Sequence, residues 1–96
     1  MLTKNDLEQE NGLVMVDFFA NWCAPCKAIA PLLEELSKTK NVKLIKVDVD
    51  QNPELASEFN VKGIPTVLFM KNGVLKETHV GAAPKAKFEV LLEGLI

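Results

Sequence analysis

Residues 22–27 read Trp-Cys-Ala-Pro-Cys-Lys and hold both cysteines of this 96-residue chain, Cys23 and Cys26. An almost wholly apolar run, residues 13–19, precedes them, and apolar residues at helical spacing follow them. This order predicts a buried strand that passes the chain to a helix at the cysteines. A thiol there faces unpaired backbone N–H groups and the positive end of the helix dipole, which favour the reactive thiolate. The pair is therefore predicted to be a redox-active dithiol.

Three other roles for the cysteine pair have weaker support. A structural disulfide that closes so short a loop would remove little chain entropy, worth about 2 kcal/mol. A structural zinc site normally takes four protein ligands, but the sequence has no second cysteine pair and one histidine, His79, far along the chain. Inert core cysteines are the third role, and the neighbouring proline and polar flank argue against it.

The composition is that of a globular protein, with 48% hydrophobic and 25% charged residues. We expect one domain, residues 1–96, which at this length buries about two thirds of its unfolded surface. A net charge of −2 without a basic run argues against nucleic-acid binding, and no apolar run is long enough to cross a membrane. The N-terminal residues do not resemble a secretory signal. We therefore expect a cytoplasmic monomer, in a compartment where paired cysteines are usually catalytic or redox-sensing.

Strands and helices are predicted to alternate along the chain. A strand, a helix and a strand in succession form a right-handed βαβ unit, so the first two strands should be parallel. Asn72-Gly73 is a strong signal for a type I′ hairpin turn, and the broken alternation of the return strand suggests a bulge. The predicted elements are a short helix capped by Thr3 and Asp6 and ended by Asn11-Gly12, strands at 13–19, 42–49, 65–70 and 74–80, and helices starting at Pro25, Pro53 and Pro84.

Two local features of these elements are also predicted. Asn52 precedes Pro53 and is expected to cap its helix. Pro65 cannot donate to a sheet, so it is placed at the start of its strand. The sequence alone favours a trans bond before Pro65.

Asp17 is the one charged residue inside the apolar run 13–19. We expect it to be buried, which would raise the pKa of its carboxyl group and make it a proton acceptor close to the cysteines. A surface carboxylate at a strand end is the alternative. Lys46 on the next strand is its candidate partner. Lys27 is expected to be exposed, with electrostatic support of the thiolate as its alternative role.

From about Leu13 to its end, the chain closely resembles the thioredoxin family. The resemblance rests on several motifs in the same order as in that family, and together they are far more specific than the cysteine pair alone. The matching residues are Val16-Asp17-Phe18, Trp22 to Lys27, Pro31, Lys46, Asp50-Gln51-Asn52-Pro53, Gly63-Ile64-Pro65-Thr66, Asn72-Gly73 and Val80-Gly81-Ala82.

The resemblance implies an α/β protein with the thioredoxin fold. Its central mixed sheet would have four strands, with a short fifth at the N-terminus left open, helices on both faces and a cis bond before Pro65. Cys23 would be the exposed nucleophile, Cys26 the buried resolving thiol, Asp17 the acceptor of the Cys26 proton, and Lys46 the residue that tunes Asp17. An apolar groove would hold an extended substrate segment, pairing with the Ile64 backbone. The substrate-binding residues implied are Trp22, Ala24, Pro25, Val49, Ile64, Pro65, Gly81 and Ala82.

The implied function is thiol–disulfide oxidoreduction. The protein would reduce protein disulfides through reversible Cys23–Cys26 exchange and serve as an electron carrier in cell redox homeostasis, with no bound cofactor or metal. The resemblance also implies that an NADPH-dependent thioredoxin reductase, a flavoprotein, is the electron donor. The chain has no Gly-rich nucleotide-binding loop of its own. The alternative is a thioredoxin-fold binding subunit that holds a partner in the groove without turnover.

Three departures from the family pattern stand out. Ala24 occupies a position that is usually Gly, and residues between the cysteines influence redox poise. Phe19 replaces a common second Trp, which leaves Trp22 as the only Trp. The N-terminus is short, so only residues 1–3 could supply the family's extra first strand. Without that strand, residues 42–47 would form a sheet edge, which Lys43 and Lys46 would protect from edge pairing.

Overall fold

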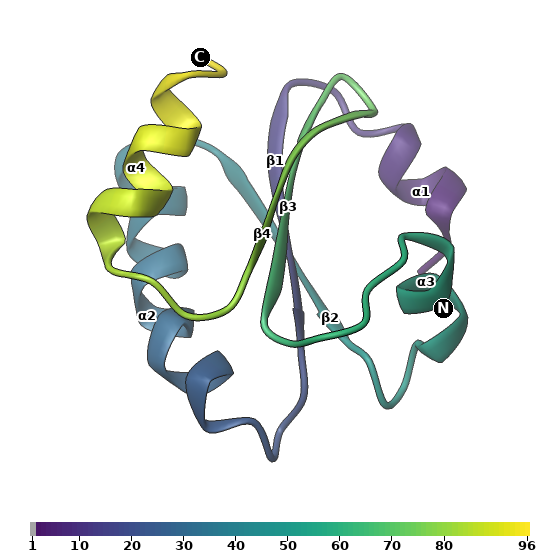
Figure 1. Cartoon of the computed structure of the whole chain (residues 1–96). Coiled ribbons are helices and arrows are strands. Elements are labelled where there is room, and N and C mark those ends of the chain that lie inside the picture. The colour runs from purple at the N-terminus through teal and green to yellow at the C-terminus, as the bar shows by residue number, and fades with distance from the viewer. Residues whose placement is uncertain (1) are drawn as a thin grey trace.

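The computed structural model describes residues 2–96, which form a four-stranded mixed sheet with helices on both faces (Figure 1). The strand order is β2-β1-β3-β4, with β1 parallel to β2 and antiparallel to β3, and β3 antiparallel to β4. The predicted parallel pair and mixed sheet are therefore confirmed. The elements are α1 (Lys4–Glu8), β1 (Leu13–Phe19), α2 (Ala24–Thr39), β2 (Lys43–Asp48), α3 (Pro53–Glu58), β3 (Thr66–Lys71), β4 (Val74–Val80) and α4 (Lys85–Glu93).

Strand β1 lies inside the sheet, which explains its continuous apolar sequence. Strands covered on both faces read as apolar runs, because side chains on each side enter a core. Val16 and Phe18 belong to the core on the α1 and α3 side, whereas Met15 belongs to the core on the α2 and α4 side. Asp17 has the same parity as Met15 and therefore faces α2. The charged side chain thus lies under the helix that carries the cysteines.

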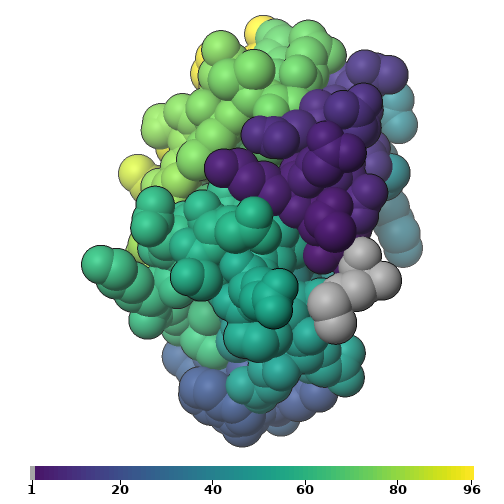
Figure 2. Space-filling model, turned by 90° about the vertical axis from the view of Figure 1, so that its right-hand side faces the viewer, coloured from purple at the N-terminus to yellow at the C-terminus, as the bar shows by residue number. Residues whose placement is uncertain are grey.

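Each pair of helices covers one face of the sheet. Helices α2 and α4 bury Leu33 and Phe88 against one face, and α1 and α3 bury Leu7 and Leu55 against the other. Figure 2 shows this second face, where the N-terminal segment lies against α3. No helix among residues 2–96 has the length and apolar character needed to cross a membrane.

Of the two predicted helix N-caps, that of α1 is confirmed and that of α3 is wrong. The Thr3 hydroxyl accepts from the Asp6 N–H at 3.1 Å, and Asp6 accepts from the Thr3 N–H at 2.9 Å, so this capping box is confirmed. Helix α1 nevertheless ends at Glu8, before the predicted Asn11-Gly12. Asn52 stands at the N-cap position of α3, but its side chain donates to the Asp48 carbonyl at 3.1 Å and makes no cap bond. The Asn52 side chain therefore bonds to the end of β2 instead of to the backbone N–H groups of α3.

The hairpin between β3 and β4 forms as predicted, and β2 lies at an edge of the sheet. Asn72 and Gly73 have φ values of 53° and 80°, as a type I′ turn requires, and the register shifts between Phe69 and Met70 as a bulge. The suggested fifth strand is absent from residues 2–96, and Met1 lies outside the described residues. Strand β2 is therefore an edge of the described sheet.

Gly73 provides a stability test of the packing between the hairpin and α1. Its φ is +80°, and a Cβ added there would collide with the Glu8 carbonyl group. We expect Gly73→Ala to lower the free energy of unfolding by about 2 kcal/mol, combining left-handed strain with overpacking. Gly12→Ala is the matched control, because Gly12 has φ +76° but open space around it, so about 1 kcal/mol is expected. Equal urea midpoints for the two variants would contradict the collision.

Candidate active site

Cys23 occupies the N-cap position of α2, directly after the turn that follows β1. Its backbone is extended, with φ −89° and ψ 107°, and its N–H donates to the Ala20 carbonyl at 3.1 Å. The Cys23 Sγ accepts from the Cys26 N–H at 3.2 Å, and Pro25 fits the first helical turn because a missing N–H costs nothing there. The Sγ therefore sits at the positive end of the helix dipole, where a thiolate is favoured.

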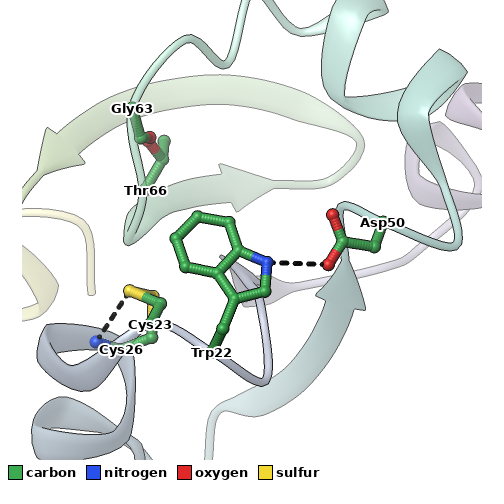
Figure 3. The surroundings of a disulfide bond; sticks show 6 residues. All are labelled: Trp22, Cys23, Cys26, Asp50, Gly63 and Thr66. Atoms are coloured by element: carbon green, nitrogen blue, oxygen red, sulfur yellow. Dashed lines mark hydrogen bonds between the residues drawn. A yellow bond between two sulfur atoms is a disulfide. The ribbon is translucent and has the colours of Figure 1, made fainter.

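Cys23 and Cys26 are joined by a disulfide, with Cα atoms 5.3 Å apart (Figure 3). The exposed fraction is 4% for Cys23 and 2% for Cys26. The expectation of an exposed Cys23 is therefore wrong for the disulfide form. The physical reason is packing: the two cysteines and Ala20 form a small cluster that Val49 and Ile64 help to cover.

Trp22 stands beside the disulfide as an exposed apolar side chain. Its exposed fraction is 70%, and its indole Nε1–H donates to the Asp50 carboxylate at 2.9 Å (Figure 3). Asp50 in turn donates its own N–H to the Asp48 carboxylate at 2.8 Å. The hydrogen bond that Trp22 donates to Asp50 orients the indole ring. The sequence analysis assigned no role to Asp50. Its position just after β2, at the sheet edge where β1 also ends, could have indicated that it lies near Trp22.

An apolar hollow of about 200 Å³ opens next to Trp22. The structure brings Trp22, Val49 and Ile64 together in its wall, as the resemblance implied. It adds Ala56, Val61 and Lys62, which sequence reasoning missed. Ala56 follows the buried Leu55 on α3, so its small side chain on the inner part of a helix was the only hint.

The other residues that the resemblance assigns to the substrate groove do not line this hollow. The Ile64–Pro65 bond is cis, so the resemblance was right here and the trans expectation from sequence alone was wrong. The Gly81 N–H donates to the Pro65 carbonyl at 2.8 Å, which ties the end of β4 to this segment. Ala24, Pro25 and Ala82 are exposed at the surface.

Asp17 is buried, as predicted, with 1% of its surface exposed. Within residues 2–96, neither carboxylate oxygen has a hydrogen-bond partner. Burial raises the pKa of Asp17 to about 6, and the positive charge of Lys46 partly opposes this rise. Asp17 and Cys26 line the same cavity of about 120 Å³, which is large enough to hold water.

Lys46 lies opposite Asp17 in the register of β1 and β2, but it does not form an ion pair with it within the described chain. Its Nζ lies 5.0 Å from the centre of the Phe19 ring, a cation–π distance. Lys46 therefore acts on Asp17 through its field rather than by direct contact. Lys27 is exposed, as expected, and lines the same cavity.

Comparison with known proteins identifies the family of the chain. The sequence model of the thioredoxin family matches residues 3–93. The chain belongs to the thioredoxin family. It is 42% identical to a thioredoxin from Listeria monocytogenes over 95 residues, covering 95% of this chain and 92% of that protein. It is 46% identical to a Bacillus subtilis thioredoxin over 87 residues, covering 88% and 84%.

A solved structure agrees with the family assignment and the fold. An N21Q mutant thioredoxin from Halobacterium salinarum superposes with a TM-score of 0.88 and 34% sequence identity. The match covers 94% of this chain and 80% of that chain. The thioredoxin fold is therefore shown.

Thioredoxins are protein-disulfide oxidoreductases, so the chain is a thiol–disulfide oxidoreductase with the Cys23–Cys26 pair as its redox centre. The family acts on disulfide-containing proteins, is re-reduced by thioredoxin reductase and uses no external cofactor. In the part of the chain that the structure describes, no three acidic, His or Cys side chains gather as a metal site.

Proposed function

We propose that Cys23 is the attacking thiol in the reduction of protein disulfides. The observation that carries this role is the position of its Sγ at the N-cap of α2, where it accepts the Cys26 N–H. In the reduced protein the Cys23 thiolate attacks one substrate sulfur, a mixed disulfide forms and the other substrate sulfur leaves as a thiolate. Cys26 then attacks Cys23 Sγ and the second substrate thiolate leaves. The Cys23–Cys26 dithiol has thereby given two electrons to the substrate and has become a disulfide.

Asp17 is proposed to accept the proton that Cys26 must lose before it attacks. A base works best when its pKa lies near the operating pH, and the pKa of about 6 meets this condition for neutral solution. The shared cavity of about 120 Å³ allows water to carry the proton between the two groups. Lys46 tunes this base, because its positive charge lowers the pKa that burial raises.

The substrate segment is proposed to lie extended across the apolar surface beside the disulfide. The hollow next to Trp22 takes one of its apolar side chains, and Ile64 pairs with its backbone as an added strand would. The surface that makes this contact comprises Trp22, Ala24, Pro25, Val49, Ile64, Pro65, Gly81 and Ala82.

An NADPH-dependent thioredoxin reductase is proposed as the electron donor. We propose that residues 1–96 work as a single thioredoxin domain and as a monomer in the cytoplasm, where a reduced dithiol is maintained. The similarity to bacterial thioredoxins over nearly the whole chain supports this assignment.

Insulin reduction by dithiothreitol tests the function. Insulin disulfides should be reduced several-fold faster with catalytic amounts of the wild-type protein, and Cys23→Ser should lose all of this acceleration because it has no attacking sulfur. Trp22 fluorescence and circular dichroism verify that both proteins are folded.

The binding-subunit alternative makes the opposite prediction. If the folded wild-type protein gave no acceleration, and Cys23→Ser retained the same partners as the wild type in a pull-down, the reductase proposal would be wrong. Reduction of the wild-type disulfide by NADPH and a bacterial thioredoxin reductase, followed by absorbance at 340 nm, tests the proposed donor separately.

A further inference from the structure

We propose that Phe19 is a positioning residue whose ring holds the Lys46 ammonium group at the mouth of the cavity that Asp17 and Cys26 share. The inference rests on the proposed role of Asp17 as the proton acceptor. It assigns a role to a position where this chain departs from the common family residue, and it names the contact through which that residue acts.

The contact follows from the register of two neighbouring strands. Asp17 pairs with Lys46 across β1 and β2, and Phe19 lies two residues after Asp17 on the same face. The Lys46 Nζ does not reach the Asp17 carboxylate, whose oxygens have no hydrogen-bond partner among residues 2–96. It lies 5.0 Å from the centre of the Phe19 ring instead. The half-buried ring and the exposed lysine stem thus form one wall of the cavity.

A lysine at this position needs such a contact to stay in place. Its four-carbon stem is flexible and its ammonium is strongly hydrated, so an exposed lysine has no preferred direction without a partner. The face of an aromatic ring attracts a cation within about 6 Å. Because the field of a charge falls with distance, the effect of Lys46 on Asp17 depends on the ring that restrains it.

Among residues 2–96, no carboxylate forms a salt bridge with Lys46. Asp48 follows Lys46 on the same face of β2, but its carboxylate accepts from the Asp50 N–H at 2.8 Å and from the Asn21 amide at 3.5 Å. Lys27, from α2, is the other cation that lines the cavity. Cys26 carries no charge, because it is bonded to Cys23 in the disulfide. The positive charge of Lys46 lowers the pKa of Asp17.

The position of Lys46 matters for the resolving step. An ionised Asp17 is needed before Cys26 can give up its proton, and burial opposes that ionisation. A cation held close to the cavity mouth favours the ionised form. Phe19 would therefore act on the reaction through Lys46 and Asp17, without touching the substrate sulfur.

Carboxyl ¹³C NMR of the oxidised protein tests this chain of contacts directly. In this form the cysteines do not titrate, so the Asp17 titration is free of coupling to them. The variants are Phe19→Leu, which keeps the apolar volume but removes the ring, Phe19→Trp, which keeps a ring, Lys46→Gln, and the Phe19→Leu/Lys46→Gln double variant. Lys27→Gln serves as the matched charge control.

We expect Phe19→Leu to move the Asp17 midpoint upward by about half a pH unit, the size of an exposed cation–π contact. Phe19→Trp should stay at or below the wild-type midpoint. In the Lys46→Gln background, Phe19→Leu should cause no further shift, and Lys27→Gln should shift the midpoint less than Lys46→Gln. The pH profile of the resolving step should move in the same direction as the midpoint for Phe19→Leu.

Three results would overturn the proposal: an unchanged midpoint in Phe19→Leu, an equal shift in the Lys46→Gln background, or the same shift in Phe19→Trp. If Phe19→Leu does not fold, Phe19→Met replaces it, because an unbranched side chain fills the same space without a ring. A different experiment tests the proposed role of Asp17. That role would be wrong if an Asp17→Asn variant resolved mixed disulfides as fast as the wild type. The midpoints in the oxidised protein do not depend on that outcome.

Discussion

Reduced Cys26→Ser protein is expected to form a lasting mixed disulfide with a protein substrate and to release almost none of it. Cys23 keeps its place at the N-cap of α2 and still attacks, but no second thiol follows it in the helix to displace the substrate. In a reaction without small thiols, we expect release to fall roughly a thousandfold, as losses of a reacting sulfur do. Non-reducing gel electrophoresis measures the trapped complex, and Ellman's reagent measures the released substrate thiol.

The reciprocal variants distinguish the two cysteines. Cys23→Ser and the Cys23→Ser/Cys26→Ser double variant should trap no substrate, because neither has the attacking thiol at the helix terminus. This comparison is needed because 4% and 2% exposure in the disulfide form hardly separates the two residues. A complex trapped by Cys23→Ser instead of Cys26→Ser would show that the roles are exchanged.

Much of the fold could be predicted because its signals are local. The apolar run 13–19 forms β1 with the predicted bounds, and the Asn72-Gly73 turn, the capping box of α1 and the bulge in the hairpin are all present. Each of these depends on the backbone preference or side-chain period of a few adjacent residues. Helix α3 starts at Pro53 as predicted, and α2 starts at Ala24, one residue before the predicted Pro25.

The features that sequence reasoning missed depend on residues far apart in the chain. Asn52 gives its side chain to the end of β2 instead of capping α3. The bond from Trp22 to Asp50 joins two loops that only the closed sheet brings together. The burial of Cys23 likewise results from cover by Val49 and Ile64, which no pattern around residue 23 reveals.

The burial of Asp17 and the place of Lys46 opposite it were predicted, but the contact that the Lys46 ammonium makes was not. A carboxylate inside an apolar run signals burial, and Asp17 is indeed 1% exposed. The register also places Lys46 opposite it. The contact of the Lys46 ammonium with the Phe19 ring could not be foreseen, because side-chain direction at a sheet edge depends on which partner the flexible stem meets.

Asp17→Asn is expected to stabilise the protein at neutral pH and to slow its catalysis. The pKa of Asp17 rises from an ordinary 3.8 to about 6, chiefly because of burial, so the ionised carboxylate destabilises the native state. A shift of this size corresponds to about 3 kcal/mol in the free energy of unfolding at pH 7 to 8. The amide carries no charge and removes this penalty. Resolution of mixed disulfides should slow about tenfold or more, because the proton acceptor of Cys26 is lost.

The pH dependence gives the sign of the effect. Well below pH 3.8, Asp17 is protonated in both the folded and the unfolded protein, so ionisation of Asp17 then gives Asp17→Asn no advantage over the wild type. Between about pH 4 and 6 the folded protein binds more protons at this group, and the wild type loses stability as the pH rises. Above pH 6 both states are ionised, and the advantage of Asp17→Asn should reach its plateau.

Urea unfolding at pH 4, 6 and 8 measures this advantage, and Glu34→Gln is the matched control. Glu34 is exposed on α2, so removal of its charge should change the free energy of unfolding by no more than about 0.5 kcal/mol at any of these pH values. An Asp17→Asn advantage that is the same at pH 4 and pH 8 would come from repacking and not from ionisation. An unchanged urea midpoint together with an unchanged resolving rate would remove Asp17 from the mechanism, and the proton of Cys26 would then have to pass directly to water.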